Sequence, residues 1–301
     1  YLCKKEKEMH KSGFVNIVGN PNVGKSTLMN ALVGERISII TSKAQTTRHR
    51  ILGIVNGDDF QIVYSDTPGV LKPNYRLQES MLSFSNSALS DADVLLYVTD
   101  VYDNYEKNKD FVDKVGQNTA PVMLIINKID MIDQQKLEDL VDKWKTVLPN
   151  AEIFPISATE KFNIEPLFNR ILALLPEFPP FFEKDQLTDK PAKFFVTEII
   201  REKILLNYEK EIPYSVEVEV EQFKEEAALI RINAVIYVER DSQKGIIIGK
   251  GGKSLKKVGI EARKDIEAFF EKKVFLELYV KVEKDWRNKD LKLRSFGYKQ
   301  E

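Results

Sequence analysis

The chain has 301 residues, of which 43% are hydrophobic and 30% are charged, and its formal net charge is -1, which predicts an ordinary globular protein of about two domains. No apolar run approaches the ~18 residues of a membrane span, and no signal-peptide pattern opens the chain. Cys3 is the single cysteine, which excludes an internal disulfide and suits a reducing cytosol. With two histidines besides, the chain lacks the ligands of a standard zinc site.

Short β-rich runs alternate with helical patterns in the first part of the chain. Strands are expected at 14–18, 51–55, 61–64, 94–98, 122–126 and 153–156. The fourth and fifth runs are almost wholly apolar, as in strands buried on both faces of a parallel sheet. The alternation predicts an α/β domain with a doubly wound, mostly parallel sheet over residues 9–178. Residues 1–8 are interpreted as an N-terminal extension, with a native start at Met9.

A glycine-rich loop follows the first expected strand and opens a helix. It fits the P-loop pattern with Gly19, Asn20, Pro21, Asn22, Val23, Gly24, Lys25 and Ser26, followed by Thr27. Backbone N–H groups and the positive end of the helix dipole would cradle phosphates there. We expect Lys25 to neutralise the β and γ phosphates and Ser26 to ligate Mg²⁺.

An acidic turn, Asp66-Thr67-Pro68-Gly69, follows the strand expected at 61–64. A carboxylate at that strand end can reach Mg²⁺, and the Gly69 N–H can sense a γ-phosphate. Val70 stands where Ras-like proteins carry the glutamine that orients the attacking water. Either other groups position the water, or hydrolysis waits for a partner that reorganises the site.

The motif Asn127-Lys128-Ile129-Asp130 follows the buried strand at 122–126 and selects the base. The Asp130 carboxylate can accept both N1–H and N2–H₂ of guanine, whereas adenine would leave it unpaired. We expect Lys128 to lie along the base and Asn127 to tie this loop to the P-loop. Ser157 and Ala158, after the last strand, are expected to offer backbone N–H to guanine O6.

A polar segment at 38–50 lies between the P-loop and Asp66 and is expected to be switch I. One of its threonines should bind Mg²⁺ when the γ-phosphate is present; Thr47 is favoured and Thr46 is the alternative. The predicted catalytic set is therefore Lys25, Thr47, Asp66 and Gly69, and the predicted metal ligands are Ser26, Thr47 and Asp66. The side chain of Asn22 either caps the P-loop or helps to bind K⁺ beside the phosphates.

Prolines at 176, 179 and 180 interrupt the pattern, and residues 179–192 are interpreted as a linker. Beyond it the order changes to helix (193–208), strand (215–221), strand (229–238), short helix, helix and strand (274–282). Residues 216, 218 and 220 alternate with glutamates, which predicts a half-buried strand. One face of the later helix carries Leu255, Val258, Ala262, Ile266 and Phe269. The order predicts an α+β domain over 193–284, followed by a tail at 285–301 that either packs on the domain or extends a binding surface, with packing favoured for Trp286.

A GxxG loop separates the short helix from the long one. The expected RNA contacts are Ile248, Gly249, Lys250, Gly251, Gly252, Lys253, Lys256 and Lys257. Residues 244–264 hold seven basic residues and one acidic residue, which suits a polyanionic partner. Such a loop clamps about four nucleotides in the KH module, and the strand order predicts a type II KH domain.

The four nucleotide motifs, in this order and followed by a KH domain, closely resemble the bacterial Era family of GTPases. The resemblance covers nearly the whole chain after Met9 and includes the stretches 43–50, 212–216 and 259–264. It implies a cytoplasmic, monomeric factor that binds GTP, GDP and Mg²⁺. It also implies binding of the 3′ end region of 16S rRNA through the KH domain, a role in assembly of the 30S subunit, and some peripheral membrane contact.

Two other functions are compatible with the same sequence motifs. A GTPase could act on a protein or membrane partner, with the KH fold as a docking surface, and binding of single-stranded RNA would separate that function from the first. A tRNA-modifying GTPase is disfavoured because no cysteine lies near the C-terminus.

Overall fold

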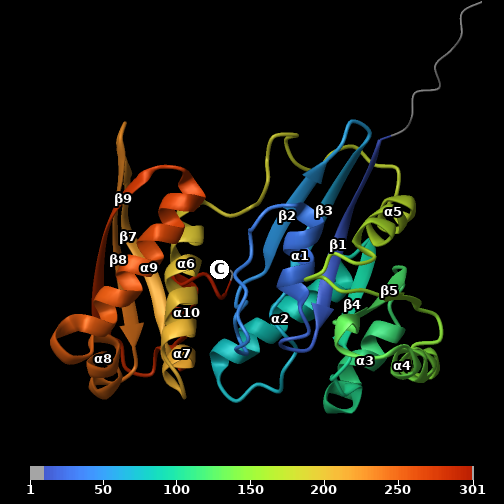
Figure 1. Ribbon diagram of the computed structural model, residues 1–301, viewed down its shortest axis with the longest axis horizontal. Helices are drawn as coiled ribbons and strands as arrows, with labels where there is room; N and C mark the ends of the chain where they lie inside the picture. Colours follow the sequence, from blue (N-terminus) through green and yellow to red (C-terminus); the bar gives the residue numbers. More distant parts are fainter. Residues whose placement is uncertain (1–9, 300–301) are drawn as a thin grey trace, which may run out of the picture. The chain divides into compact units, whose positions relative to one another are not determined.

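The structure is a computed structural model that describes residues 10–299, so the predicted N-terminal extension at 1–8 lies outside the described residues. The chain forms two compact units (Figure 1). Unit 1 contains residues up to Ser38, Thr47–Lys72 and Met81–Asp189, whereas unit 2 contains Ile39–Thr46, Pro73–Ser80 and the chain from Lys190. Two short segments from the N-terminal half of the chain therefore belong to the C-terminal unit.

Unit 1 is built on a six-stranded sheet with the order β2-β3-β1-β4-β5-β6. Its strands are β1 (Lys11–Gly19), β2 (Ile51–Asn56), β3 (Phe60–Asp66), β4 (Val94–Asp100), β5 (Val122–Asn127) and β6 (Glu152–Pro155). β2 runs antiparallel to β3, and every other neighbouring pair is parallel. All six expected strands are present, and the mostly parallel sheet confirms the predicted fold class.

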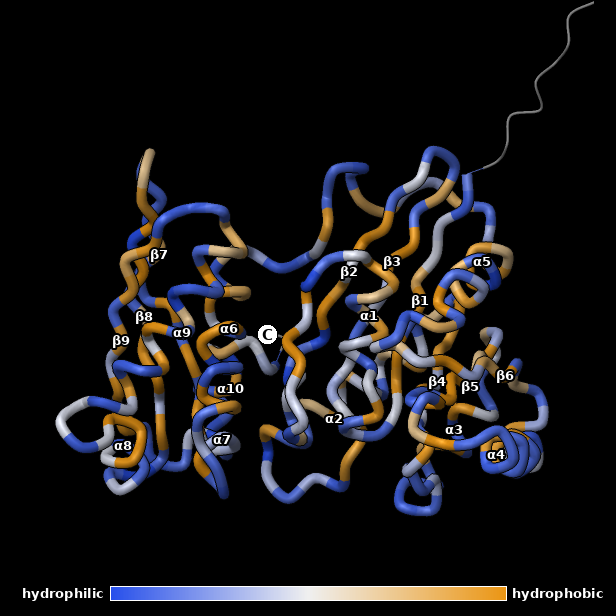
Figure 2. Tube along the Cα trace, viewed as in Figure 1, coloured by the Kyte–Doolittle hydropathy of each residue, from blue (hydrophilic) through white to orange (hydrophobic). Residues whose placement is uncertain are grey.

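Helices cover both faces of this sheet. They are α1 (Lys25–Val33), α2 (Arg76–Ser90), α3 (Lys109–Gly116), α4 (Gln134–Val147) and α5 (Ile164–Leu174). Residues of α2, α3 and α4 pack on one face of β4 and β5 around Trp144. α1 and α5 contact each other on the opposite face. Both faces of the central strands are thus buried, which explains their apolar sequences, visible as orange tube in Figure 2.

The residues expected to form a linker are held largely by unit 1. Gln61 Oε1 accepts hydrogen bonds from the backbone N–H groups of Phe181 and Phe182, at 2.7 and 2.9 Å. Farther along, Ile54 N–H donates to Leu187 O at 2.8 Å, so this segment follows the edge of β2. It covers an edge that would otherwise expose unpaired backbone groups.

Unit 2 carries a three-stranded sheet with the order β7-β8-β9. Its elements are α6 (Ala192–Asn207), α7 (Ile212–Ser215), β7 (Glu217–Glu225), β8 (Leu229–Val238), α8 (Asp241–Ile248), α9 (Lys253–Phe270), β9 (Lys273–Val282) and α10 (Asp290–Ser295). β7 pairs with β8 antiparallel and β8 with β9 parallel. The expected order of helices and strands is confirmed, although α7 replaces the first residue of the strand expected at 215–221.

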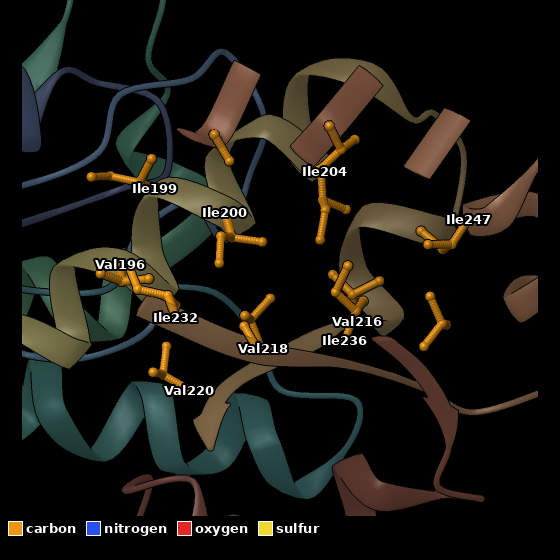
Figure 3. Close-up of a cluster of buried hydrophobic side chains, with 14 of the residues drawn as sticks. Val196, Ile199, Ile200, Ile204, Val216, Val218, Val220, Ile232, Ile236 and Ile247 are labelled. Atoms are coloured by element: carbon orange, nitrogen blue, oxygen red, sulfur yellow. The ribbon is translucent and has the colours of Figure 1, made fainter. Parts of the chain in front are cut away.

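The hydrophobic core of unit 2 lies between α6, α9 and the sheet. Val196, Ile200 and Ile204 of α6 gather with Val218 and other residues of the strands (Figure 3). Val196, Ile200 and Ile204 are fully buried, and Val218 is 3% exposed. Burial of several such aliphatic side chains, each contributing about 1.5–3 kcal/mol, dominates the stability of the unit.

Of three predictions about single residues of unit 2, two are wrong and one is confirmed. Phe269 was expected on the core face of its helix but is 39% exposed and stacks on Phe195. Glu217 was expected to face solvent but is 3% exposed, because its carboxylate accepts a hydrogen bond from Tyr298 Oη at 2.7 Å. Trp286 is fully buried, and its Nε1 donates to Ser215 O at 3.0 Å, which confirms that it packs on the domain.

No helix among residues 10–299 is both long and apolar enough to cross a bilayer.

Candidate functional site

The P-loop lies at the carboxyl end of β1, where the chain turns into α1. Gly19 has φ +148, and a Cβ there would stand 2.1 Å from Val98 O; Gly24 has φ +95, and a Cβ there would stand 2.2 Å from Asn127 Nδ2. Only glycine fits at these two positions. This path leads the chain directly into α1, which begins at Lys25 and whose N-terminus is the positive end of the helix dipole, as phosphate binding requires.

The ammonium group of Lys25 lies inside this loop. Its Nζ donates to Gly19 O at 3.1 Å and to Asn20 O at 2.7 Å. Burial lowers the pKa of Lys25 to about 8, against the opposing charges of Asp66 and Asp103. A buried cation that is hydrogen-bonded to carbonyl oxygens gains from the negative charge of a phosphate, so the position suits the expected role.

Three oxygen-bearing side chains converge beside the P-loop. Ser26 Oγ lies 2.7 Å from Asp66 Oδ2 and 2.8 Å from Thr47 Oγ1, and Thr47 Oγ1 lies 3.3 Å from Asp66 Oδ2. The structure thus brings together the three expected metal ligands. Thr46, the alternative, turns elsewhere, since its hydroxyl bonds to Thr41 Oγ1 and Lys43 O, both at 2.6 Å.

The chemistry of this cluster fits Mg²⁺. Asp66 is fully buried, and its Oδ1 has no hydrogen-bond partner among the described residues. Burial raises the pKa of Asp66, although Ser26, Lys25 and Thr47 oppose the shift. A hard divalent cation would stabilise the ionised carboxylate and accept oxygen from both hydroxyls. When bound, Mg²⁺ would be held by Ser26, Thr47 and Asp66 and would supply positive charge to neutralise the charge that develops on the phosphates.

The turn after Asp66 is fixed against the P-loop. A Cβ on Gly69 would stand 2.7 Å from the Cα of Pro21, so the two loops pack backbone to backbone. Val70 N–H donates to Gly19 O at 3.1 Å, and the Val70 side chain is 4% exposed in the core of unit 1. The side chain at this position therefore points into the core and cannot orient a water molecule.

Asn127 ties the base-reading loop to two neighbours. Its Nδ2 donates to Val23 O at 2.8 Å, and its Oδ1 accepts from Ala158 N–H at 3.0 Å. The hydrogen bond to Asn127 Oδ1 occupies the Ala158 N–H group, which is predicted to bind guanine O6. A guanine base must therefore share this N–H group with Asn127 Oδ1 or displace that oxygen. Ser157 N–H is engaged as well, with Phe162 O at 3.3 Å.

Lys128 and Asp130 are the other polar residues of the base motif. Lys128 adopts φ +64, and its Nζ bonds to Asn22 O at 2.7 Å and to Asp100 Oδ2 at 2.5 Å. Asp130 is exposed, so its carboxylate is accessible to a base. The ion pair with Asp100 was missed by sequence reasoning, because an aspartate at the end of β4 carries no motif of its own.

The GxxG loop connects α8 and α9 in unit 2. Gly249, Gly251 and Gly252 all have positive φ, and a Cβ on Gly249 would stand 2.2 Å from Ser254 Oγ. A Cβ on Gly251 or Gly252 would meet nothing within 4 Å, so the backbone there is open to a ligand. α9 begins directly afterwards at Lys253.

A groove of about 340 Å³ runs from this loop between α9 and β9. Its lining is made of Gly252, Leu255, Lys256, Gly259, Ile260, Arg263, Leu276 and Leu278. The floor is apolar and the rim is basic, a combination that suits unpaired bases on a phosphate backbone. Of the expected RNA contacts, Gly252 and Lys256 line the groove, whereas Lys257 stands 3.8 Å from Glu261.

The groove is also lined by residues that were not predicted as RNA contacts, namely Leu255, Gly259, Ile260, Arg263, Leu276 and Leu278. Gly259 and Arg263 follow the predicted contacts Gly252 and Lys256 at spacings of three or four positions, which places these four residues on one helix face. That spacing beside a glycine was the available signal. Leu276 and Leu278 of β9 are partly buried against the core cluster of unit 2, and both also line the groove beside α9.

Comparisons with known proteins match a domain in each half of the chain. Residues 14–128 match the family described as "50S ribosome-binding GTPase", and residues 211–287 match the KH domain family. The chain is 45% identical over 291 residues to GTPase Era of Staphylococcus haemolyticus (strain JCSC1435), covering 96% of this chain and 97% of the relative. It is 43% identical, with the same coverage, to GTPase Era of Staphylococcus epidermidis.

Two solved structures resemble the whole chain. One is Era in complex with MgGDPNP and nucleotides 1506-1542 of 16S ribosomal RNA, with a TM-score of 0.93, 38% identity, and coverage of 97% of this chain and 100% of that chain. The other is a single-residue variant of Aquifex aeolicus Era bound to GDP.AlF4-, with a TM-score of 0.92, 39% identity, and coverage of 96% and 100%. By sequence and by architecture, the chain belongs to the Era family of GTPases, which bind GTP and GDP with Mg²⁺ and hydrolyse GTP.

Proposed function

We propose that this GTPase binds the 3′ end region of 16S rRNA through its KH domain and acts in assembly of the 30S ribosomal subunit, in the cytoplasm. The observation that carries the proposal is the groove beside the GxxG loop, with its apolar floor and basic rim. A related protein, 38% identical over 97% of this chain, has been solved with nucleotides 1506-1542 of that RNA.

The groove supports single-stranded RNA on physical grounds. Leu276, Leu278 and Ile260 offer apolar surface to bases, and Lys256 and Arg263 offer charge to phosphates. Packing of bases against apolar side chains removes apolar surface from water, and neutralisation of phosphate by basic side chains adds electrostatic affinity. The open glycines 251 and 252 let a sugar-phosphate chain approach the backbone closely.

Filter binding with an RNA of the 3′ end sequence tests the proposal. Gly251→Asp should weaken binding strongly, because it places a carboxylate beside the phosphates in a site where a Cβ itself has room. Gly251→Asn is the matched control, since it has the same shape, tolerates positive φ and carries no charge. Equal affinity of both variants and the parent, or no RNA binding at all, would favour a protein or membrane partner instead.

The nucleotide is proposed to control RNA binding. GTP would order the segment 38–50 and the segment after Gly69, and RNA would bind better in one state. By linkage, RNA must then change the affinity ratio of GTP to GDP by the same factor. Titrating nucleotide with and without the RNA fragment measures that factor, and a ratio unchanged by RNA would remove the switch from the proposal.

A further inference from the structure

The acidic turn at 66–69 is hydrogen-bonded to α2 through a buried serine. Ser85 Oγ donates to Pro68 O at 2.7 Å. Both residues are buried, and Ser85 is 0% exposed. Unit 1 contains both partners, since it includes Thr47–Lys72 and Met81–Asp189. The bond fixes the direction of the carbonyl, because a buried carbonyl without a partner is costly.

The same bond determines the direction of the neighbouring N–H group. Pro68 O and the Gly69 N–H belong to one peptide group, which is planar and trans. The two point in opposite directions, so a carbonyl that points to α2 turns the Gly69 N–H away from that helix. Gly69 also packs on the P-loop, where a Cβ on it would stand 2.7 Å from Pro21 Cα.

The residues on either side of Gly69 are bonded to β1 and its end. Thr67 Oγ1 donates to Ile17 O at 2.8 Å, and Val70 N–H donates to Gly19 O at 3.1 Å. In contrast, the N–H of Gly69 has no hydrogen-bond partner within residues 10–299. This donor therefore remains available to a ligand.

We propose that Ser85 is a positioning residue for GTP hydrolysis: by holding the Pro68 carbonyl, it presents the Gly69 N–H to the γ-phosphate. The inference rests on the predicted contact of Gly69 with that phosphate. Ser85 acts through the peptide group and not by contact with the nucleotide. A donor that is held in place before the substrate binds needs no reorganisation when charge develops on the phosphate. GDP has no γ-phosphate, so its affinity should be nearly independent of Ser85.

The bonds on either side of this peptide group limit what a Ser85 variant loses. In Ser85→Ala the bonds of Thr67 and Val70 to β1 remain. The turn therefore stays beside the P-loop, whereas the peptide group between Pro68 and Gly69 is free to change direction. The expected defect is a misdirected N–H group and not a detached turn.

The test compares Ser85→Ala with Ser87→Ala, which removes an exposed hydroxyl from the same helix. Ser85→Ala should lower the affinity ratio of a non-hydrolysable GTP analogue to GDP by about 10-fold, the order expected when one hydrogen bond to a charged group is weakened. The value of kcat should fall by a similar factor, while GDP affinity stays unchanged. Ser87→Ala should keep the parent's ratio and kcat. Because no RNA is added, the result is independent of the proposed RNA partner.

A spectrum of protein labelled with [15N]glycine observes the Gly69 N–H directly. The chain has 14 glycines, so the spectrum is simple enough to assign. In the parent, the Gly69 amide proton should lie at higher frequency with the analogue than with GDP, because a hydrogen bond to a phosphate deshields it. In Ser85→Ala this difference should largely disappear.

A purely structural role makes a different prediction. Ala88→Gly weakens the same helix at a fully buried position and removes no hydrogen bond of the turn. If Ala88→Gly, with a comparable loss of melting temperature, lowers the analogue-to-GDP ratio equally, the proposal is wrong. It is also wrong if the Gly69 signal responds to the analogue equally in the parent and in Ser85→Ala. A Gly69 signal that does not respond in the parent would overturn the predicted γ-phosphate contact, and the proposal with it.

Discussion

Ser26 Oγ lies 2.7 Å from Asp66 Oδ2, and this hydrogen bond joins the start of α1 to the end of β3. The other oxygen of the same carboxylate, Oδ1, is buried and has no hydrogen-bond partner among the described residues. Two strand-end motifs, about 40 residues apart in sequence, are thereby brought to one metal position.

Ser26→Ala should weaken the Mg²⁺-dependent binding of GTP more than the binding of GDP. Loss of one of the residues that would hold Mg²⁺ weakens binding of the metal, so the hydrolysis rate should fall on the order of 100-fold, as when one group that stabilises developing charge is removed. Titration with labelled nucleotides, with and without Mg²⁺, measures the effect on binding. Ser87→Ala, an exposed hydroxyl bonded to Phe84 O, is the control. A Mg²⁺ dependence of Ser26→Ala equal to that of the parent would contradict this assignment.

Gly19→Ala should destabilise unit 1 far more than Gly34→Ala does. Both glycines have positive φ, but a Cβ at Gly19 would stand 2.1 Å from a backbone oxygen, whereas one at Gly34 meets nothing within 4 Å. Gly34→Ala should cost about 1 kcal/mol, the conformational penalty alone. Gly19→Ala should exceed about 4 kcal/mol, or prevent folding, because backbone must move. Thermal unfolding measures both, and equal melting temperatures would refute the packing argument.

Val70→Gln should not restore a Ras-like catalytic glutamine. The Val70 side chain is 4% exposed and packs in the core of unit 1, so an amide there would be buried at a cost of about 1–3 kcal/mol. We expect lower stability and no faster hydrolysis. Val70→Ala is the comparison for lost packing. Faster turnover of Val70→Gln at unchanged stability would show that this side chain can face the nucleotide.

The prediction that K⁺ speeds hydrolysis depends on the side chain of Asn22. Its backbone has φ +65, and its carbonyl accepts from Lys128 Nζ at 2.7 Å, so the exposed side chain projects from a fixed backbone. If that side chain helps to bind K⁺ beside the phosphates, hydrolysis is faster in K⁺ than in Na⁺ buffer. Asn22→Ala should abolish the difference while GDP affinity stays. Equal rates in both buffers for the parent would leave Asn22 with a capping role only.

The nucleotide site was largely predictable from sequence because each motif follows a strand, and parallel strands deliver their carboxyl ends to one edge of the sheet. The choice of Thr47 over Thr46 was favoured from sequence, and the contacts of Thr47 with Ser26 and Asp66 support it. The engagement of the Ala158 N–H by Asn127 was not predictable, since it depends on where one side-chain amide turns.

In unit 2, the burial of several charged side chains could not be predicted from the periodicity of the sequence. Glu217 occupies a solvent-side position of the alternating pattern, yet a tyrosine 81 positions later covers it. Arg201 and Glu198 read as an ordinary charged pair on a helix, but both are buried. Burial of a charged pair depends on long-range packing and on bonds to other backbone segments, and local sequence carries no signal for either.

Selection of guanine by the nucleotide site depends on the Asp130 carboxylate, which is expected to accept both N1–H and N2–H₂ of the base. Calorimetry with GTP and ATP, on the parent and on Asp130→Asn, measures this selectivity. GTP should bind on the order of 10⁴-fold tighter than ATP, because adenine leaves the carboxylate unpaired, and Asp130→Asn should transfer the preference to a xanthine nucleotide, whose C2 carbonyl can accept from the amide. Indistinguishable binding of ATP and GTP to the parent, or an unchanged preference for GTP in Asp130→Asn, would show that Asp130 does not select the base.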